Sequence, residues 1–179
     1  MLETKNIASV IHLEIGDLTT MEIEAIVFYA QPDLLLGSGF GNAIAVRGGS
    51  SIQEELKTLG TISTGEAVIT SAGELKSNYI IHAVGPRFQE SGIEEKLNTT
   101  MQSVLRIAEE KQIREICFPP MGTGFYGIPL ELSARVMFEV IQKHLSGNSV
   151  LEKVVICLID QREYKAFQKI LEYNKDSKE

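Results

Sequence analysis

The sequence predicts an α/β fold, in which a three-layer α/β/α sandwich is built around a mixed, largely parallel sheet of about six or seven strands. Short apolar segments with strand character alternate with longer segments that carry apolar residues at helical spacing. The segments at residues 23–30 and 154–159 contain continuous apolar runs, which are typical of parallel strands buried on both faces.

Length and composition agree with one globular domain over residues 1–179, with frayed ends at residues 1–5 and 175–179. The chain has 17 Lys and Arg against 24 Asp and Glu, a net charge of −7, which argues against a nucleic-acid partner. No apolar stretch is long enough to cross a bilayer, and the N-terminus lacks the pattern of a secretory signal, so we expect a cytoplasmic location and no membrane partner. Cys117 and Cys157 lie in apolar runs and are expected to be reduced core residues.

Strands are predicted wherever apolar alternation or a short apolar run ends at turn residues. They cover residues 10–15, 23–30, 64–70, 79–84, 116–118 and 154–159. The first strand is followed by a turn in which Asp17 or Thr19 can cap a short helix. Gly85 and Pro86 stop the fourth strand.

Helices are predicted from cap residues and apolar stripes between and after these strands. They begin near Ala43, Ser50, Ser91, Pro129 and Asp160. Ser50 or Ser51, followed by Glu54, fits a capping arrangement, and Ser91 is expected to cap the longest helix. That helix carries one apolar stripe with spacings of three and four, formed by Leu97, Met101, Val104, Leu105 and Ala108.

The segment at residues 118–129 is the feature around which we expect a site to form. It connects a short apolar strand to a helix whose first turn Pro129 fits, and it contains Gly122, Gly124 and Gly127. Glycine lets the backbone approach a ligand closely, and successive N–H groups at such a crossing favour an anion. Tyr126 adds a flat ring beside them. For this segment alone, a purely structural turn is the alternative interpretation.

A second glycine-rich loop, at residues 32–41, also leads from a strand into a helix. Ligands of parallel sheets lie beyond the carboxyl ends of the strands, so both loops can lie at one edge of the sheet. Their convergence predicts one shared ligand that carries phosphates.

Taken together, these segments resemble the macro domain family, a module that binds ADP-ribose. The matching residues extend from Gly16 to Asp160, which is most of the chain. Each motif alone is weak, whereas their order and spacing are specific. The motifs are Gly16-Asp17-Leu18-Thr19, Glu24-Ala25-Ile26-Val27, Gly37-Ser38-Gly39-Phe40, Thr64-Gly65-Glu66-Ala67, Ile81-His82-Ala83-Val84-Gly85-Pro86 and the loop at residues 118–129.

The resemblance implies a role for each residue of the expected site. Asp17 would accept a hydrogen bond from the adenine amine beside the Leu18 N–H, and Ile159 would pack on the base. Gly39 and Phe40 would give backbone donors to the diphosphate from the first loop. The second loop would hold the phosphates from the other side, and the ring of its Tyr126 would border the distal ribose. The residues that contribute are Gly122, Thr123, Gly124, Phe125 and Tyr126. Two alternatives stay open: Asp17 only caps a helix, and Tyr126 is a core aromatic residue.

The chain departs from the family pattern at the end where the distal ribose would lie. The family has an Asn-Ala-Ala-Asn run where this chain has Phe28-Tyr29-Ala30-Gln31, so Gln31 replaces an asparagine that contacts this ribose. Gly41 stands where one hydrolytic subgroup has an aspartate that orients water, and bulky Phe40 replaces a small aliphatic residue. Catalytic residues therefore stay unknown, and Gln31 is either an amide contact or a passive loop residue.

The sequence leaves three functions open. The first, which we favour, is a module that binds ADP-ribose or a related nucleotide, either free or attached to a protein. The second is an enzyme that removes ADP-ribose from acidic side chains or deacetylates O-acetyl-ADP-ribose without a carboxylate base. The third is a scaffold for another nucleotide or a protein, with a pocket narrowed by Phe28, Tyr29 and Phe40, although Phe28 and Tyr29 can equally lie on opposite faces of a strand. The histidines show no metal-ligand spacing, and His82 is expected to be a core residue with satisfied hydrogen bonds, so we expect neither a metal nor a cofactor.

Overall fold

The structure, a computed structural model, describes residues 6–37 and 39–176, with side chains as far as residue 174. Within this part of the chain, six strands form one sheet in the order β1-β6-β5-β2-β4-β3, and β3 alone runs antiparallel to its neighbour. The strands are β1 (Ile11–Ile15), β2 (Ala25–Tyr29), β3 (Ala67–Ser71), β4 (Tyr79–Ala83), β5 (Glu115–Phe118) and β6 (Lys153–Leu158). The predicted mixed, largely parallel sheet is therefore confirmed.

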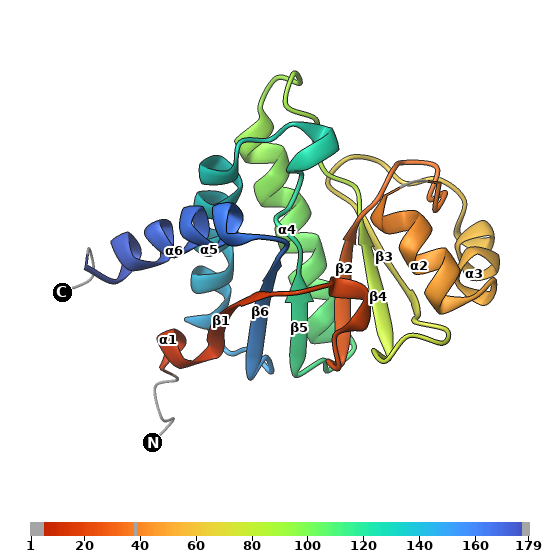
Figure 1. Cartoon of the computed structure of the whole chain (residues 1–179), viewed down its shortest axis with the longest axis horizontal. Coiled ribbons are helices and arrows are strands. Elements are labelled where there is room, and N and C mark those ends of the chain that lie inside the picture. The colour runs from red at the N-terminus through yellow and green to blue at the C-terminus, as the bar shows by residue number, and fades with distance from the viewer. Residues whose placement is uncertain (1–5, 38, 177–179) are drawn as a thin grey trace.

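Helices cover both faces of this sheet and complete the three layers of the sandwich (Figure 1). They are α1 (Ile7–Val10), η1 (Leu18–Thr20), α2 (Phe40–Gly48), α3 (Ser51–Leu59), α4 (Ile93–Glu110), η2 (Gly124–Tyr126), α5 (Leu130–Leu145) and α6 (Gln161–Asp176), where η marks a 3-10 helix. Helices α4, α5 and α6 share one buried cluster with the sheet, whereas η1, α2 and α3 share a second cluster on the opposite face. The predicted α/β/α sandwich is confirmed.

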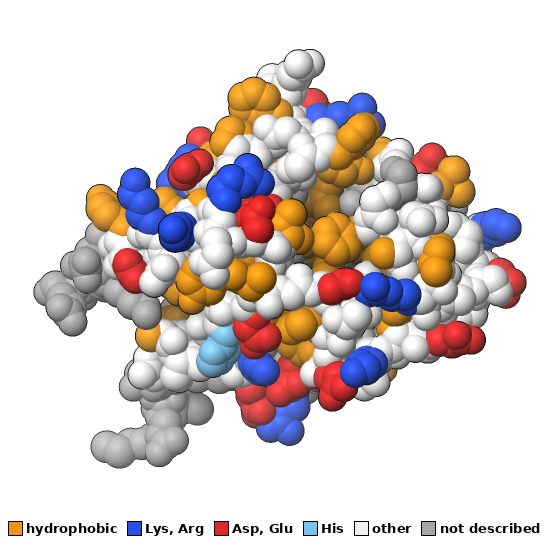
Figure 2. Space-filling model, in the orientation of Figure 1, with side chains coloured by type: hydrophobic (Ala, Val, Ile, Leu, Met, Phe, Trp, Pro, Cys, Tyr) orange, Lys and Arg blue, Asp and Glu red, His pale blue; other side chains and the backbone are white. Residues whose placement is uncertain are grey.

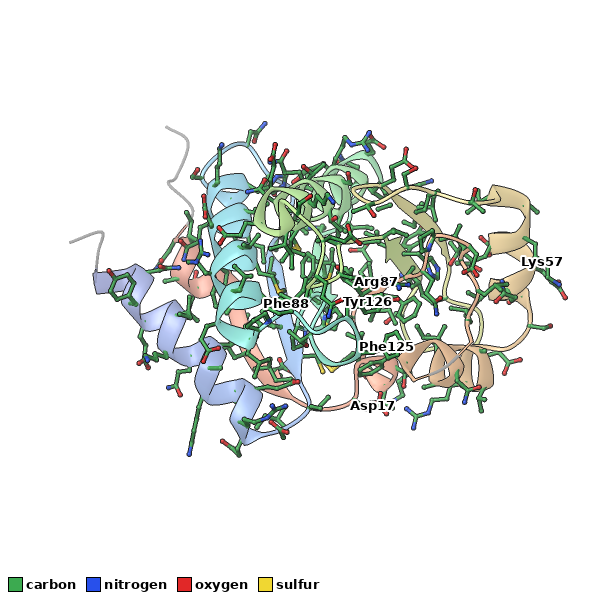
Figure 3. The ribbon with its side chains drawn as sticks, turned by 90° about the horizontal axis from the view of Figure 1, so that it is seen from above. Asp17, Lys57, Arg87, Phe88, Phe125 and Tyr126 are labelled. Atoms are coloured by element: carbon green, nitrogen blue, oxygen red, sulfur yellow. The ribbon has the colours of Figure 1, made fainter. Side chains whose placement is uncertain are left out.

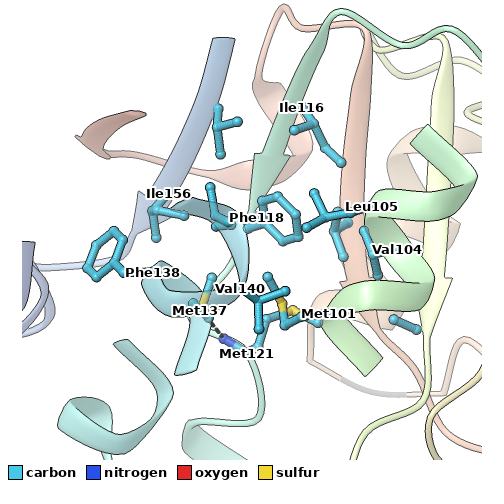
Figure 4. Packing of buried hydrophobic residues seen from close by; sticks show 14 of the residues in the cluster. Met101, Val104, Leu105, Ile116, Phe118, Met121, Met137, Phe138, Val140 and Ile156 are labelled. Carbon is cyan, nitrogen blue, oxygen red and sulfur yellow. Dashed lines mark hydrogen bonds between the residues drawn. The ribbon is translucent and has the colours of Figure 1, made fainter. Parts of the chain in front are cut away.

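The larger cluster explains the apolar stripe of α4, whose predicted members are all at most 1% exposed. In Figure 4, Leu105 of α4 faces Phe118 of β5, Met101 lies beside Val140 of α5, and Phe138 of α5 lies beside Ile156 of β6. The Met121 N–H points at the Met137 sulfur from 3.4 Å. Burial of each large apolar side chain contributes about 1.5–3 kcal/mol, so this cluster holds α4 and α5 against the sheet.

Strands β2 and β5 are neighbours whose following helices lie on opposite faces of the sheet. The chain leaves β2 toward α2, and it leaves β5 through η2 toward α5. A crevice opens above the carboxyl ends of two such strands, because their connections separate. The fold thereby places the two glycine loops on either side of one crevice, along the upper edge of the sheet in Figure 1.

Several helix starts differ from the predictions. Ser91 does not cap α4, because Gly92 is the N-cap, with the left-handed torsions φ 65° and ψ 35° that glycine adopts readily. Ser50 is the N-cap of α3, but its torsions are helical (φ −72°, ψ −23°) and its side chain makes no capping hydrogen bond. Helix α2 begins at Phe40, earlier than predicted, and Pro129 is the N-cap of α5 rather than part of its first turn.

The ends of the described chain add two differences. Helix α1 was not predicted, and the Asn6 side chain caps it by accepting a hydrogen bond from the Ala8 N–H at 3.2 Å. Helix α6 continues to Asp176 and so includes the first two residues of the predicted C-terminal tail, whereas residues 1–5 and 177–179 lie outside the described residues. Among the helices of the described ranges, none has the length and apolar character that crossing a membrane requires.

Candidate functional site

A hollow of about 410 Å³ lies over the carboxyl ends of β2 and β5, between the two glycine loops. Figure 2 shows it near the middle of this face, with hydrophobic side chains along its walls. Its size is typical of small-molecule sites. Apart from Asp17, every residue of the predicted site lines it: Leu18, Gln31, Gly39, Phe40, Gly122, Thr123, Gly124, Phe125, Tyr126 and Ile159.

Asp17 lies in a second hollow, of about 470 Å³, which shares Gly39, Phe40 and Ile159 with the first. The two hollows therefore form one groove. Oδ1 of Asp17 accepts hydrogen bonds from the N–H and the hydroxyl of Thr19, and its other oxygen pairs with Arg47. Burial raises the pKa of Asp17, but the hydrogen bonds from Thr19 and Arg47 outweigh it and hold the pKa below its ordinary value. Asp17 thus caps η1, as one of the two interpretations predicted, and stays ionised at the groove.

Main-chain N–H groups on both sides of the first hollow are uncommitted. Gly124 and Phe125 open the single 3-10 turn η2, and Gly39 and Phe40 form the start of α2, where a helix leaves its first donors without internal partners. Within the described ranges, none of these four N–H groups donates to a protein acceptor, and neither does that of Gly122. Thr123 differs, since its N–H and its hydroxyl both point back at a carbonyl of the same loop, 3.5 and 3.2 Å away.

The second glycine loop, residues 118–129, is closed by its own main chain. The Ile128 N–H donates to the Gly122 carbonyl at 3.0 Å, and the Gly127 N–H donates to the Gly124 carbonyl at 3.0 Å. Gly122 has a φ of 75°, and a Cβ at this position would lie 2.3 Å from the Ile128 side chain. A close approach of backbone to side chain therefore requires glycine here.

The first glycine loop, residues 32–41, is held by a side chain from outside it. The Gln53 amide of α3 accepts a hydrogen bond from the Leu36 N–H at 2.9 Å and donates one to the Leu34 carbonyl at 3.3 Å. Leu34 is buried with a φ of 58°, a conformation that residues with a side chain rarely adopt. This strained backbone persists because the surrounding contacts hold it. Ser38 of this loop lies outside the described residues.

Phe28 and Tyr29 occupy opposite faces of β2, as one interpretation predicted, and both form walls of the hollow. The Phe28 ring lies 3.2 Å, and the Leu36 Cα 3.3 Å, from a Cβ placed at Gly41, so both crowd any side chain at that position. The Tyr29 hydroxyl donates a hydrogen bond to the Pro86 carbonyl, and burial raises the pKa of Tyr29 far above its ordinary value. Tyr29 therefore acts as a fixed, neutral wall.

Glu163 is a wall residue that our sequence reasoning missed. It is 6% exposed, and its Oε2 accepts a hydrogen bond from the Ile159 N–H at 3.0 Å. Its own N–H donates to Oδ1 of Asp160 at 2.9 Å, so the carboxylate of Asp160 caps α6. An acidic residue three positions after a helix cap is the spacing of a capping box, and this signal would have drawn attention to Glu163. Ile159 itself is 56% exposed, which leaves its side chain available to a flat ligand.

His82 is fully buried, as predicted, but only one of its ring nitrogens has a partner. Nε2 lies 2.9 Å from the Thr70 hydroxyl, whereas Nδ1 has no partner in the described chain, so the prediction of satisfied hydrogen bonds is wrong for Nδ1. Burial lowers the pKa of His82 to about 3. Cys117 and Cys157 are buried free thiols, as predicted. Within the residues that the structure describes, no three His, Cys, Asp or Glu side chains gather as a metal site.

Known proteins are similar to this chain in sequence and in architecture. The family model described as Macro domain matches residues 29–137. A macro domain-containing protein of Caldanaerobacter subterraneus is 39% identical over 163 residues, which cover 88% of this chain and 93% of the relative. An uncharacterized protein of Sulfurisphaera tokodaii is 40% identical over 161 residues, which cover 88% of each chain.

Solved structures agree with these sequence matches. The Oceanobacillus iheyensis macrodomain with ADP superimposes with a TM-score of 0.90 at 30% identity, covering 96% of this chain and 95% of that chain. The Trypanosoma brucei macrodomain in complex with ADP-ribose gives a TM-score of 0.83 at 29% identity, covering 89% of this chain and 68% of that chain.

Proposed function

The chain belongs to the macro domain family, and from this premise we propose that it binds ADP-ribose or a closely related ADP-ribosyl nucleotide between its two glycine loops. The observation that carries the proposal is the set of uncommitted N–H groups on the two sides of one crevice, at Gly39, Phe40, Gly122, Gly124 and Phe125. Donors at helix starts favour phosphate oxygens, because the N–H groups and the helix dipole both point toward the anion. The ADP and ADP-ribose of the two solved relatives support a nucleotide in this position.

The family resemblance implies adenine at Asp17 and the distal ribose at Gln31, and the two hollows support this direction. Asp17 lines only the second hollow, whereas Gln31 and Tyr126 line only the first. A carboxylate has about four lone-pair positions, and the Thr19 and Arg47 contacts leave one of them for the adenine amine. The exposed Ile159 side chain is placed to pack on the base.

The residues at the distal end fit binding better than they fit an ADP-ribosyl hydrolase or an O-acetyl-ADP-ribose deacetylase. Gly41 is crowded by Phe28 and Leu36, so no carboxylate is readily accommodated at residue 41. Among the described residues that line the hollow, Glu163 carries the only carboxylate, and it already accepts the Ile159 N–H at the adenine end. Hydrolysis would therefore have to use a water molecule held by the substrate itself.

A scaffold function without a small ligand receives less support. Phe28, Tyr29 and Phe40 narrow the hollow, yet about 410 Å³ remains between them and the second loop. The hydrogen bond from the Tyr29 hydroxyl to the Pro86 carbonyl fixes this ring in the wall of the hollow. A different nucleotide in the same hollow is an outcome that ligand competition would detect.

Calorimetric titration with ADP-ribose tests the proposal. We expect saturable binding by the wild-type chain and an affinity at least about 100-fold lower in Gly124→Glu, because the new carboxylate would repel the diphosphate. No atom lies within 4 Å of a Cβ at residue 124, so the side chain enters open space, although the φ of 70° adds backbone strain. Thermal unfolding of the variant separates a binding defect from a folding defect.

Gly60→Glu is the matched control. Gly60 also has a positive φ, 74°, with no atom within 4 Å of a Cβ, and it lies at the end of α3 rather than at the hollow. An equal loss of affinity in Gly60→Glu, or no heat from the wild-type chain at millimolar ADP-ribose, would contradict the proposal. Release of ADP-ribose from a modified protein by the wild-type chain would instead establish the hydrolase.

A further inference from the structure

A cationic and aromatic surface lies at the mouth of the hollow, on its Tyr126 side. The Arg87 guanidinium is 6.0 Å from the centre of the Tyr126 ring, and the Phe125 ring meets that ring edge-on at 5.6 Å. The Phe88 N–H donates a hydrogen bond to the Tyr126 carbonyl at 3.0 Å. Figure 3 shows these residues grouped together, with Asp17 further along beyond Phe125. We name Arg87, Phe88 and Phe125 the mouth surface.

The mouth surface is open to a partner. Phe125 is 90% exposed and Phe88 is 51% exposed, and Arg87 is exposed beside them. Arg87 and Phe88 lie outside the lining of the hollow, whereas Phe125 lines it. A nucleotide held inside the hollow is therefore separated from Arg87 by Tyr126, and a larger group attached to the distal ribose would pass over the mouth surface.

Arg87 differs from the other arginines in its charge partners. Each of the others pairs with an Asp or Glu: Arg47, Arg106, Arg114, Arg135 and Arg162. Arg87 forms no such pair with any described residue. Glu90 follows closely in the sequence, but its carboxylate accepts the Arg87 backbone N–H at 3.2 Å and the Lys96 ammonium at 3.0 Å. An unpaired guanidinium on a chain of net charge −7 is available to an acidic partner.

The backbone below the mouth surface is fixed on both sides. The Tyr29 hydroxyl donates to the carbonyl of Pro86, and the rings of Tyr29 and Tyr126 lie 4.8 Å apart. Gly85 packs directly on this hydroxyl, since a Cβ there would lie 2.2 Å from it. Arg87 is therefore presented by a segment that is already ordered, which lowers the entropy cost of binding a partner.

We propose that the mouth surface binds an acidic segment of the protein to which the ADP-ribosyl group is attached. This inference rests on the proposed function, because that function places the distal ribose beside Tyr126. Arg87 offers a planar set of donors that matches a carboxylate, and Phe88 and Phe125 offer apolar area for neighbouring side chains of the same segment. A small anion on the ribose would use Arg87 and leave both rings uncovered, so the combination favours a polypeptide.

Two ligands test this inference: free ADP-ribose, and a synthetic peptide that carries ADP-ribose through a non-hydrolysable linkage and is flanked by glutamates. We expect the wild-type chain to bind the peptide about tenfold more tightly, with the gain reduced at high salt. Arg87→Gln should lose roughly five- to tenfold of the peptide affinity, while its affinity for free ADP-ribose stays within about twofold. Phe88→Ser should lose a smaller part of the additional affinity that the peptide has over free ADP-ribose. Arg87→Lys should keep part of this additional affinity.

Lys57→Gln is the matched control, because it removes one positive charge from the exposed face of α3, away from the mouth surface in Figure 3. An equal loss in Lys57→Gln, an equal loss of both ligands in Arg87→Gln, or an equal gain from a peptide flanked by glutamines overturns the inference. If the wild-type chain binds ADP-ribose and binds the acidic peptide no more tightly, the inference about the mouth surface is wrong and the proposed function still stands. If it binds neither ligand, the proposed function fails with it. A linked pair of ADP-ribose units that binds more tightly than the peptide, in an Arg87-dependent way, overturns the polypeptide in favour of a nucleotide polymer.

Discussion

The two glycine loops face each other across one hollow, yet different interactions hold them in place. The second loop is closed by hydrogen bonds among its own residues, such as the one from the Ile128 N–H to the Gly122 carbonyl. The first loop contains Leu34 at a positive φ and is held by Gln53, which belongs to a helix further along the chain. Both loops have local and distant contacts, but the second loop closes its glycine turn with its own main chain, whereas the strained Leu34–Leu36 segment of the first loop is held by a side chain from α3.

The same difference appears in the layer beneath the loops. Phe28 packs under the first loop, and the centre of its ring lies 6.1 Å from the centre of the buried His82 ring. Tyr29 packs under the second loop beside Tyr126. Burial lowers the pKa of His82 to about 3 and raises that of Tyr29 far above its ordinary value. Mild acid therefore leaves both side chains neutral in the folded chain, but it protonates His82 once the chain unfolds, whereas Tyr29 stays neutral in both states.

The largest effect that we expect from this difference is on stability in acid. The pKa of His82 is about 3 in the folded chain against an ordinary value of 6.5, so the unfolded chain takes up the proton first as the pH falls. Stability from neutral His82 is present above pH 6.5 and declines below it, by roughly 2 kcal/mol between pH 7 and pH 5. Urea unfolding of the wild-type chain across this range measures the decline. His82→Gln, which can still bond to Thr70, should remove most of it, and an unchanged decline in that variant would assign the effect to other groups.

Sequence reasoning succeeded where the interactions are local. The strands, the stripe of α4 and the glycines of the second loop follow from spacing alone, because each depends on residues close together in the chain. It did not find Gln53, since nothing in an amphipathic helix indicates which of its polar residues reaches a loop in another part of the fold. Nor did it foresee the helical torsions of Ser50, which lies in the two-residue connection between α2 and α3, two helices that pack on each other.

The glycines of the two loops should differ in how well they tolerate a side chain. Gly39 has φ 56° and ψ −129°, a region that is essentially restricted to glycine, whereas Gly127 has the left-handed helical torsions φ 76° and ψ 10° that asparagine also adopts. We expect Gly39→Ala to lower the free energy of unfolding by roughly 2 kcal/mol and Gly127→Ala by about 1 kcal/mol.

Crowding does not account for this expected difference. A Cβ at residue 39 would meet no atom within 4 Å, and one at residue 127 would make an ordinary contact with Phe88 at 3.5 Å. Urea unfolding of the two variants, with Gly127→Asn as a nearly neutral control, measures it. Equal losses would mean that the first loop is no more strained than the second.

A third prediction concerns the side chain that holds the first loop. Gln53→Glu keeps the acceptor for the Leu36 N–H but removes the donor to the Leu34 carbonyl, so at neutral pH the first loop loses one of its two hydrogen bonds to this side chain. We expect about a tenfold loss of ADP-ribose affinity, because the N–H groups of Gly39 and Phe40 then lose their alignment. The measurement is the ratio of wild-type to variant affinity by calorimetry.

That ratio should approach one as the pH falls toward the pKa of the new carboxyl group, because a protonated glutamate can donate to the Leu34 carbonyl again. Gln102→Glu is the control, since Gln102 makes its hydrogen bond to Asn98 within α4 and takes no part in either loop. A loss of stability alone would not produce this recovery, because mild acid destabilises the fold through His82 rather than strengthening it. If the ratio is independent of pH, the donor to Leu34 does not hold the first loop, and both loops would have to be regarded as self-supporting.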